Sequence, residues 1–413
     1  MDTAELFALL DRELQQLFPR MVAIRRHLHR HPEPSGQEWE TTAYLAELLR
    51  DEGLQVTLGP DRRGLWAQLP QAPQQGLVVL RADLDALYIH DAKNAEYASG
   101  RPGVMHACGH DAHAAMLVGT SLALTRLASR GVEVPPNWRA VFQPEEETSC
   151  GAQNMIQAGA LQGAEAAIAA HVDPSRRVGT VGLRPGAITA ACDTLEFVIR
   201  GRGGHAARPH EAADPIAAAA QLISTLYLFV PRATESHEAV VLTIGQIEGG
   251  QNPNVIPEEV RLGGTLRTLR QQVRENTLEH IRKLVQGLAQ TSNTRIQFRT
   301  AGGSPAVVND TALTRLVQRA AQDALGAENV ELIPRPSMGS EDFAFFVQRV
   351  PGVLFRLGSH RPGRPPTQLH AADFDIDEQV LLHGARVLGR VALLTADRPC
   401  SPGPRNQKQS RNR

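Results

Sequence analysis

The segment at residues 105–113, MHACGHDAH, carries two side chains of types that bind divalent metals, Cys108 and His110. A thiolate and an imidazole at this spacing can hold one cation if the backbone turns between them, and Gly109 permits such a turn. Considered alone, the pair also fits a buried cysteine beside a helix start, with Asp111 as the helix N-cap. The segment is therefore a candidate metal site that needs further ligands.

Three consecutive carboxylates, Glu145, Glu146 and Glu147, follow an apolar run that predicts a strand over residues 139–142. Such a run of like charges is usually a solvated stretch. At the end of a strand, adjacent carboxylates can instead divide two roles: one ligates a metal, while the next deprotonates a metal-bound water.

His171, His370 and Asp83 are further candidates. His171 follows a predicted strand over residues 166–170, Asp83 follows one over residues 77–80, and His370 lies in a loop. Considered alone, each of these three residues could also be a hydrogen-bonded residue at a strand end or in a turn. In open α/β sheets, however, the carboxyl ends of parallel strands form the edge where ligands bind. Together with the cysteine and the glutamates, these residues predict a two-metal hydrolytic site.

The elements that must position these residues alternate between strand and helix. A mixed, largely parallel sheet flanked by helices is the fold that this alternation predicts, and we assign it to residues 1–186 and 302–395. Apolar residues at helical spacing predict a helix over residues 6–17 and a second one over 21–28, with Pro19 interrupting them.

Residues 187–301 follow a β-α-β-β-α-β order, which is typical of a ferredoxin-like motif and predicts an inserted α+β domain. The glycine-rich stretch before His205 lacks the spacing of a dinucleotide-binding fingerprint. It is either a flexible loop or a device that presents His205 to an oxyanion. Residues 396–413 have no apolar face and predict a disordered tail.

Length and charge narrow the class of protein. A chain of 413 residues favours two domains, and 43 Lys+Arg against 44 Asp+Glu argues against nucleic acid as the main partner. No stretch approaches the roughly 18 apolar residues of a membrane span. The acidic N-terminus is unlike a secretory signal, so we expect a cytoplasmic protein without a membrane partner. Four widely separated cysteines fit no disulfide framework.

Taken together, the motifs resemble the M20 metallopeptidase family, and within it the amidohydrolase branch of hippurate hydrolases, N-acyl-amino-acid deacylases and auxin-conjugate hydrolases. The resemblance covers about residues 20–395. Its motifs are RRHLHRHPE (25–33), RADLDAL (81–87), CGHD (108–111), FQP (142–144), GGHAA (203–207), NVIP (254–257), GTLRT (264–268) and GSEDF (339–343).

The resemblance implies a dinuclear metal centre. Two divalent ions per subunit, Zn or Mn with Co or Ni as alternatives, would be held by Cys108, His110, Glu147, His171 and His370. The reaction would be hydrolysis of the amide bond of an N-acyl amino acid to a carboxylic acid and a free amino acid, by attack of a metal-bridging hydroxide.

The resemblance also assigns roles around this centre. Glu146 would be the catalytic base, and Asp83 would orient the site from behind the ligands. The inserted domain would act as a lid and would build a homodimer, in which His205 serves the partner's active site. Asn254 and Arg267 would contact the substrate.

Three other functions stay open. One is a dipeptidase or aminoacyl carboxypeptidase of the same family, and another is a non-catalytic metal-binding relative. The third is a hydrolase in which Cys108 attacks and His110 assists. The chain departs from the family pattern at Glu145, where alanine is usual, at Tyr88, where proline is usual, and at residues 90–97 and 249–253. These departures lie near the expected substrate mouth and bear on the choice of substrate.

Overall fold

The computed structural model describes residues 2–363 and 365–395 and divides into two compact units. Among the described residues, the first unit comprises 2–186, 308–334 and 345–395 without 364, and the second comprises Ala187–Val307 and Arg335–Ala344. The inserted domain expected from the sequence spans residues 187–301. The predicted disordered tail, residues 396–413, lies outside the described residues.

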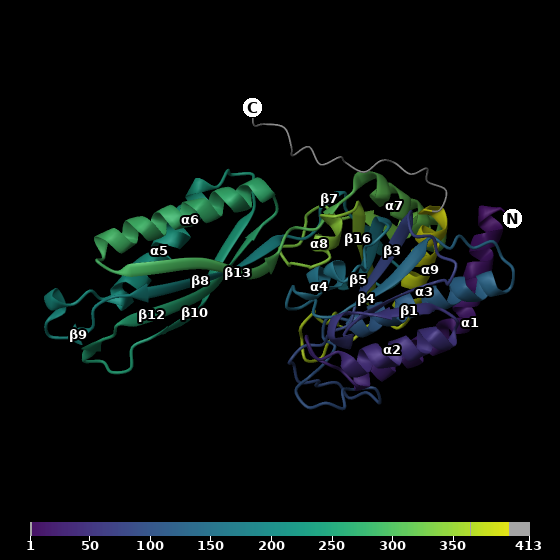
Figure 1. The fold of residues 1–413 in the computed structure, drawn as a ribbon, viewed down its shortest axis with the longest axis horizontal. Helices are drawn as coiled ribbons and strands as arrows, with labels where there is room; N and C mark the ends of the chain where they lie inside the picture. The colour runs from purple at the N-terminus through teal and green to yellow at the C-terminus, as the bar shows by residue number, and fades with distance from the viewer. Residues whose placement is uncertain (1, 364, 396–413) are drawn as a thin grey trace. The chain divides into compact units, whose positions relative to one another are not determined.

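The first unit is built on an eight-stranded sheet in the order β1-β2-β4-β3-β5-β16-β6-β15 (Figure 1). At its centre, β3 runs parallel to β4 and β5, and β5 runs parallel to β16. The strands are β1 (Gln55–Leu58), β2 (Leu65–Gln68), β3 (Leu77–Asp83), β4 (Trp138–Gln143), β5 (Ala164–Arg177), β6 (Val181–Leu183), β15 (Val330–Leu332) and β16 (Gly352–His360). The predicted mixed, largely parallel sheet is therefore confirmed.

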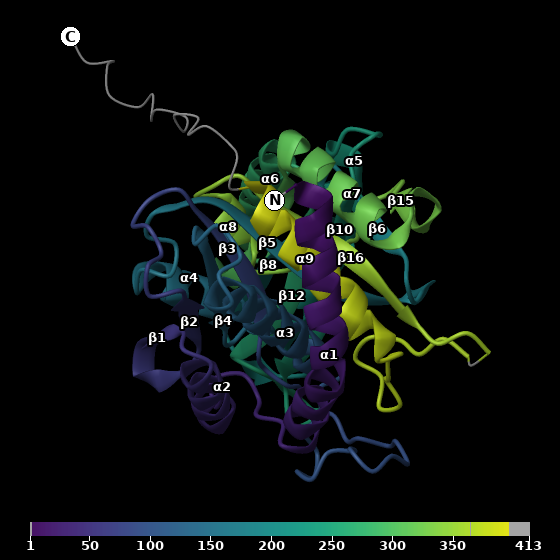
Figure 2. The ribbon, with the colours of Figure 1, turned by 90° about the vertical axis from the view of Figure 1, so that its right-hand side faces the viewer.

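Helices cover this sheet. They are α1 (Thr3–Arg30), α2 (Trp39–Asp51), α3 (His110–Ser129), α4 (Gly151–Gln157), α7 (Thr311–Leu325), α8 (Ala344–Val347) and α9 (Gln379–Thr395), with the 3-10 turns η1 (Pro60–Arg62) and η3 (Ala327–Asn329). α1, α3 and α9 pack side by side (Figure 2). Both β3 and β4 are buried along their whole length, so the strands that lead to the candidate site are rigidly held.

The N-terminal helix differs from the prediction. We expected two helices separated at Pro19, and this was wrong: α1 is one helix with Pro19 inside it. The apolar face stays in phase across the proline, since Leu14, Leu17, Met21 and Ile24 are all buried. Burying this continuous stripe outweighs the roughly 3 kcal/mol that an interior proline costs.

The second unit is an antiparallel sheet in the order β10-β12-β8-β13 with two long helices. Its elements are β8 (Ala191–Arg200), β9 (Gly204–His205), η2 (Pro209–Glu211), α5 (Pro215–Ala233), β10 (Val240–Gly249), β11 (Val255–Ile256), β12 (Glu259–Thr268), α6 (Gln271–Thr291) and β13 (Arg295–Ser304). Short strands β7 (Gly186–Ala187) and β14 (Val308–Asn309) lie where the chain passes between the units. The order β8-α5-β10-β12-α6-β13 is the predicted β-α-β-β-α-β sequence, with the first strand at the centre of the sheet.

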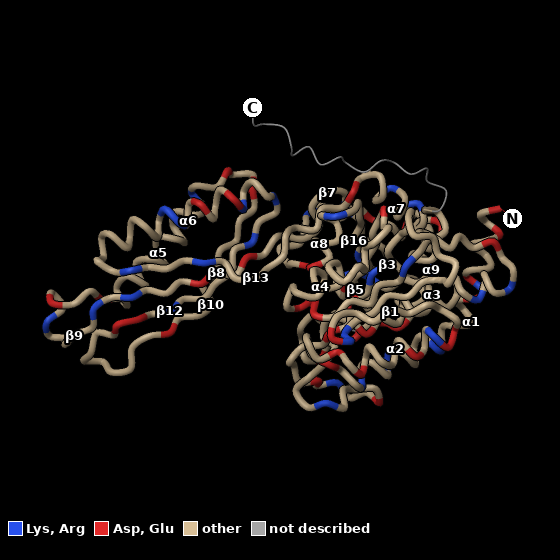
Figure 3. Tube along the Cα trace, viewed as in Figure 1, with Lys and Arg blue, Asp and Glu red and all other residues tan. Residues whose placement is uncertain are grey.

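The helix α5 is more apolar than we expected from the sequence. Within the described residues, α5 is long and apolar enough to cross a membrane, judged by length and composition alone, and 28% of that window is buried. Ala219, Leu222 and Leu226 on its inner face pack into the core of the second unit. Elsewhere in both units, basic and acidic residues are interspersed along the chain (Figure 3).

Candidate metal centre

A tight turn presents Cys108 and His110 from the start of α3. Gly109 is the N-cap residue of this helix and has φ +86°, a conformation that L side chains rarely adopt. A Cβ atom at this position would lie 2.5 Å from Cγ2 of Val172. Only glycine fits, as the sequence suggested, and the turn aims both side chains to one side. Cys108 is 7% exposed and His110 is fully buried.

His171 comes from β5, but not from its end. The prediction that a strand stops at residue 170 was wrong, because β5 continues to Arg177 alongside β16. β5 extends beyond the end of β3. Arg81 pairs with Ala169, so the last residue of β3, Asp83, is level with His171. The Nδ1 of His171 donates to the carbonyl of Val172 (2.7 Å), which leaves Nε2 3.5 Å from the sulfur of Cys108.

The glutamates occupy the turn after β4. Glu145 takes φ +54°, and its side chain forms an ion pair with Arg63 at 2.8 Å. The turn that follows brings Glu146, 8% exposed, and Glu147 toward His110. Oε1 of Glu147 lies 3.9 Å from Nε2 of His110.

His370 reaches the same place from the loop before α9. Its backbone has φ +63°, and its N–H donates to the carbonyl of Ala107 at 2.9 Å. The ring Nε2 lies 3.3 Å from Oε1 of Glu147, and this contact raises the pKa of His370. The hydrogen bond to residue 107 therefore ties the last predicted ligand to the segment that carries the first two.

The donor atoms of these residues form overlapping groups in which all members lie within 4.8 Å of one another. The groups are Cys108, His110 and His171; Cys108, Glu147 and His370; and His110, Glu146 and Glu147. Within the described residues, Nε2 of His110 is buried without a hydrogen bond. Buried polar atoms without partners are costly, and thiolate, imidazole and carboxylate are the ligands that Zn and similar ions prefer. The set therefore fits a divalent metal.

Negative charge surrounds the imidazole of His110. Burial alone would lower its pKa, but Asp83 and Cys108 outweigh burial and raise the pKa well above the usual value. A site that stabilises positive charge on a ring also stabilises a cation placed beside it.

Asp85 orients two of the predicted ligands, although only Asp83 of the segment at residues 81–85 was included in the predicted site. The Nδ1 of His110 donates to both the carbonyl (2.9 Å) and Oδ1 (3.1 Å) of Asp85. Oδ2 of Asp85 accepts from the backbone N–H of Glu147 at 3.0 Å. One carboxylate thus orients two predicted ligands, which is the usual task of an outer-shell partner. The signal was the spacing of Asp83 and Asp85, because alternate residues at a strand end point to the same side.

Asp83 lies behind the predicted ligands and binds His113 rather than a ligand. It accepts from Nδ1 of His113 at 2.6 Å and pairs with Arg81 at 2.7 Å, while His110 Nε2 is 3.8 Å away. His113 in turn accepts from the backbone N–H of Val172 at 2.9 Å. Asp83 therefore acts on the site mainly through His113, which joins α3 to β5, and it lies further from the ligand His110.

Arg25 joins the two ligand-bearing segments. Asp111 is not the N-cap that we predicted: its carboxylate lies in the first turn of α3 and accepts from Nε of Arg25 (2.9 Å) and from His29 (2.8 Å). The other guanidinium nitrogens of Arg25 donate to Asp375 (3.0 Å) and Glu378 (3.2 Å). The fully buried Arg25 thus connects the residue after His110 to the loop after His370.

The remaining predicted residues lie in the second unit. His205 and Val255 face each other in the β9–β11 pair, and Ala206 N–H donates to the carbonyl of Asn254 at 3.1 Å, so His205 and Asn254 are neighbours. Nδ1 of His205 accepts from a backbone N–H at 3.0 Å, which leaves Nε2–H as a donor. Arg267 is separate from them, near the far end of β12, where it donates to the carbonyl of Met338 at 2.9 Å. The contacts of these three residues with substrate remain predictions.

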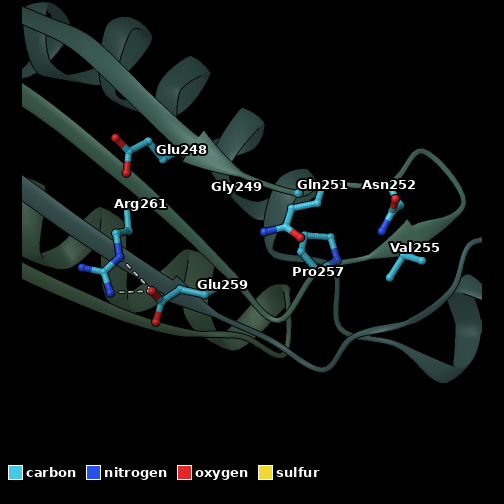
Figure 4. A pocket seen from close by; sticks show the side chains of 9 residues that line it. Glu248, Gly249, Gln251, Asn252, Val255, Pro257, Glu259 and Arg261 are labelled. Carbon is cyan, nitrogen blue, oxygen red and sulfur yellow. Dashed lines mark hydrogen bonds and ion pairs between the residues drawn. The ribbon is translucent and has the colours of Figure 1, made fainter.

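A pocket of about 450 Å³ is lined by residues of β10, β11 and β12 and by the loop between β10 and β11 (Figure 4). Its lining includes Glu248 and an ion pair of Glu259 with Arg261 at 2.7 Å. Residues 249–252, which belong to the unusual stretch at 249–253, form part of the wall. The sequence departure therefore shapes a pocket next to Asn254.

Comparison with known proteins decides the family. The model of "Peptidase family M20/M25/M40" matches residues 79–394. This chain belongs to the M20 family. A Synechocystis sp. protein is 41% identical over 92% of this chain and 96% of its own length. An N-acetyl-L-cysteine deacetylase of Bacillus subtilis is 36% identical, covering 91% of this chain and 88% of its own length. An IAA-amino acid hydrolase of Arabidopsis thaliana is 34% identical, covering 91% and 85%.

Solved M20 structures have the same fold. A protein of methicillin-resistant Staphylococcus aureus superposes with a TM-score of 0.87 at 31% identity, covering 94% of this chain and 99% of that one. The YXEP protein of Bacillus subtilis, described as a dinuclear metal binding M20 peptidase, gives 0.77 at 32% identity, covering 92% and 98%. The predicted family is confirmed, and the chain is an M20 hydrolase whose relatives include a dinuclear metal protein.

Proposed function

We propose that this M20 hydrolase is a cytoplasmic, metal-dependent amidohydrolase that cleaves N-acyl amino acids. The observation that supports the proposal is the convergence of Cys108, His110, Glu147, His171 and His370 beside a buried Glu146. Their donor set suits Zn or Mn, with Co or Ni as alternatives. The proposed ligands come from the start of α3, the turn after β4, the interior of β5 and a loop, so the folded α/β sheet assembles them at one edge.

A pair of divalent ions held by these residues would supply Lewis acidity and would lower the pKa of a bound water toward about 7. The protein's own residues would do the rest. Glu146 would accept a proton from the attacking water on a carboxylate oxygen and return it to the leaving amine. Asp85 would keep the Nδ1 proton of His110 in place, so that Nε2 faces the centre. His205 of a partner subunit would donate Nε2–H to the developing oxyanion.

The names of relatives guide the substrate class. The relatives act, by name, on N-acetyl-L-cysteine and on IAA-amino acids, which are both amides of an amino acid nitrogen. We extend this chemistry to the present chain as amide hydrolysis of an N-acyl amino acid. Dipeptides are the alternative, and a panel of both kinds of amide separates the two.

Cys108 fits a ligand better than a nucleophile. Burial, with Glu147 adding to it, raises the pKa of its thiol to about 12. A cysteine nucleophile needs the opposite shift, because the thiolate is the reactive form. A metal ion deprotonates a coordinating thiol, so the same environment is compatible with metal binding.

We also propose that the second unit forms the homodimer. β10 is an edge strand of its sheet, and the neighbouring helix α5 exposes Tyr227, Leu228 and Phe229 at 45%, 59% and 46%. An unpaired edge beside exposed large apolar side chains favours association. Light scattering should show a dimer for the wild type and a monomer for Leu228→Glu. If both proteins are dimers, the assignment of this surface to the dimer interface is wrong.

Glu146→Gln tests the mechanism. It keeps the shape and removes the base, so turnover of N-acyl amino acids should fall about 10²- to 10⁴-fold while metal content, measured by plasma mass spectrometry, stays at the wild-type level. Glu133→Gln, on an exposed loop, is the matched control and should keep full activity. Chelation should abolish activity, and Zn²⁺ or Mn²⁺ should restore it. Near-wild-type turnover in Glu146→Gln would refute the assignment of the base.

A further inference from the structure

Arg139 differs from the other buried arginines of the described chain in having no carboxylate partner. Arg25, Arg81, Arg139 and Arg390 are buried, at 0%, 2%, 7% and 3% exposure. Arg25 pairs with Asp111, Arg81 pairs with Asp83, and Arg390 pairs with Asp11 and Asp323. Arg139 has no such ion pair within the described residues.

The protein contacts of Arg139 satisfy only one side of its guanidinium. Nε donates to Oε1 of Gln68 at 2.8 Å, and Nη1 donates to the carbonyls of Ala160 (3.0 Å) and Gln162 (2.9 Å). Nη2 has no hydrogen-bond partner among the described residues. All three acceptors are neutral, so they leave the positive charge uncompensated. Burial accordingly lowers the pKa of Arg139, and no neighbouring acid acts against burial.

A cavity of about 370 Å³ lies against this side chain. It opens near the amino end of β4, the end of the strand opposite to the glutamate turn. Its lining contains Arg139 as the single charged residue, four glutamines, two prolines and an alanine. The glutamines are Gln55, Gln68, Gln74 and Gln162. Because the amide oxygen of Gln68 accepts from Arg139, its NH₂ group is left to donate elsewhere.

We propose that this cavity binds a small oxyanion, a carboxylate or a phosphate, through Arg139 and the surrounding amide donors. Buried charges in proteins are paired, because removing a lone charge from water costs several kcal/mol. A guanidinium suits oxyanions by its charge and its planar donors. Since the lining offers no carboxylate of its own, a bound anion supplies the missing partner.

Gln74→Glu provides the test, because it places a carboxylate in the cavity while Arg139 keeps its loop contacts. Gln75→Glu is the matched control: it makes the same charge change one residue away, on an exposed residue outside the lining. The metal-loaded full-length protein is titrated with inorganic phosphate or with acetate, each against chloride at equal ionic strength. Heat release and melting temperature are recorded.

We expect saturable binding and a raised melting temperature for wild type and Gln75→Glu with phosphate, acetate or both. Gln74→Glu should bind at least about tenfold more weakly. Anion binding at the metal centre is common to all three proteins, so it cancels in the comparison of the two variants. The proposal is overturned if wild type shows no effect beyond chloride, or if the two variants respond alike to both anions. In those cases Arg139 only tethers the loop at residues 160–162.

Discussion

Replacing Arg25 by methionine should destabilise the first unit strongly. The guanidinium is fully buried and holds three carboxylates, Asp111 at 2.9 Å, Asp375 at 3.0 Å and Glu378 at 3.2 Å. Asp111 is itself only 1% exposed, and without Arg25 it would keep His29 as its partner. Burial alone raises the pKa of Asp111, but Arg25 together with His29 and His106 outweighs burial and holds that pKa well below the usual range. Removing one member of a buried ion pair costs about 3–5 kcal/mol.

The adjacent Arg26 provides a matched control. Its side chain is 44% exposed and pairs with Glu378 on the surface. An exposed pair contributes less than about 1 kcal/mol, so Arg26→Met should leave the unfolding free energy nearly unchanged.

Urea unfolding followed by tryptophan fluorescence measures the difference between these two variants. Trp39, Trp66 and Trp138 are the chain's three tryptophans, and all lie in the first unit. With a slope of about 3 kcal/mol per molar urea, Arg25→Met should shift the midpoint by more than about 1 M. Equal midpoints for Arg25→Met and Arg26→Met would refute the reasoning, because they would mean that the buried cation contributes no more than the exposed one.

Three further predictions concern the shell around the metal centre. Burial and the nearby Asp85 raise the pKa of Glu38 to about 7 from an ordinary 4.5. The folded protein therefore keeps a proton that the unfolded chain releases, and stability falls as pH rises through this window. Glu38→Gln should gain about 3 kcal/mol over wild type between pH 4.5 and pH 8 in urea unfolding, and an unchanging difference would contradict this. Gly109→Ala should cost about 3 kcal/mol in the same assay, from the left-handed backbone and the overlap with Val172; a loss below about 1 kcal/mol would count against the turn. Asp85→Ala frees the ring of His110 and should weaken metal binding about 10- to 100-fold in a competitive chelator titration, whereas unchanged affinity would exclude the orienting role.

The sequence predicted the layers of the fold because its apolar periodicity is strong in the central strands and long helices. It failed where packing overrode a local signal. Pro19 should end a helix by its own chemistry, yet the buried stripe on both sides of it keeps α1 continuous. The end of β5 was misplaced because its partner β16 lies far along the chain, and pairing with β16 extends the strand past His171.

The candidate site was predictable to a similar degree. Motif residues such as Cys108 and Glu147 could be chosen from type and spacing, and the structure places them in one cluster. The sequence left Asp85 open as a turn residue or an orienting carboxylate, since its contact with His110 depends on how β3 meets α3. Arg25 was part of a quoted motif, but only its burial against Asp111 and Asp375 reveals what it does. Sequence spacing carries information about elements, whereas such contacts depend on their packing.

Because the first unit is built from chain segments on both sides of the second unit, its parts are synthesised at different times. Its polypeptide stops at Gly186 and resumes at Val308, after nearly all of the second unit has been made. Four of the five proposed ligands, up to His171, emerge before that interruption, and His370 emerges after it. β16, which lies between β5 and β6 in the sheet, is also translated late. A nascent chain released early would thus lack both the central strand β16 and His370, the last of the proposed ligands.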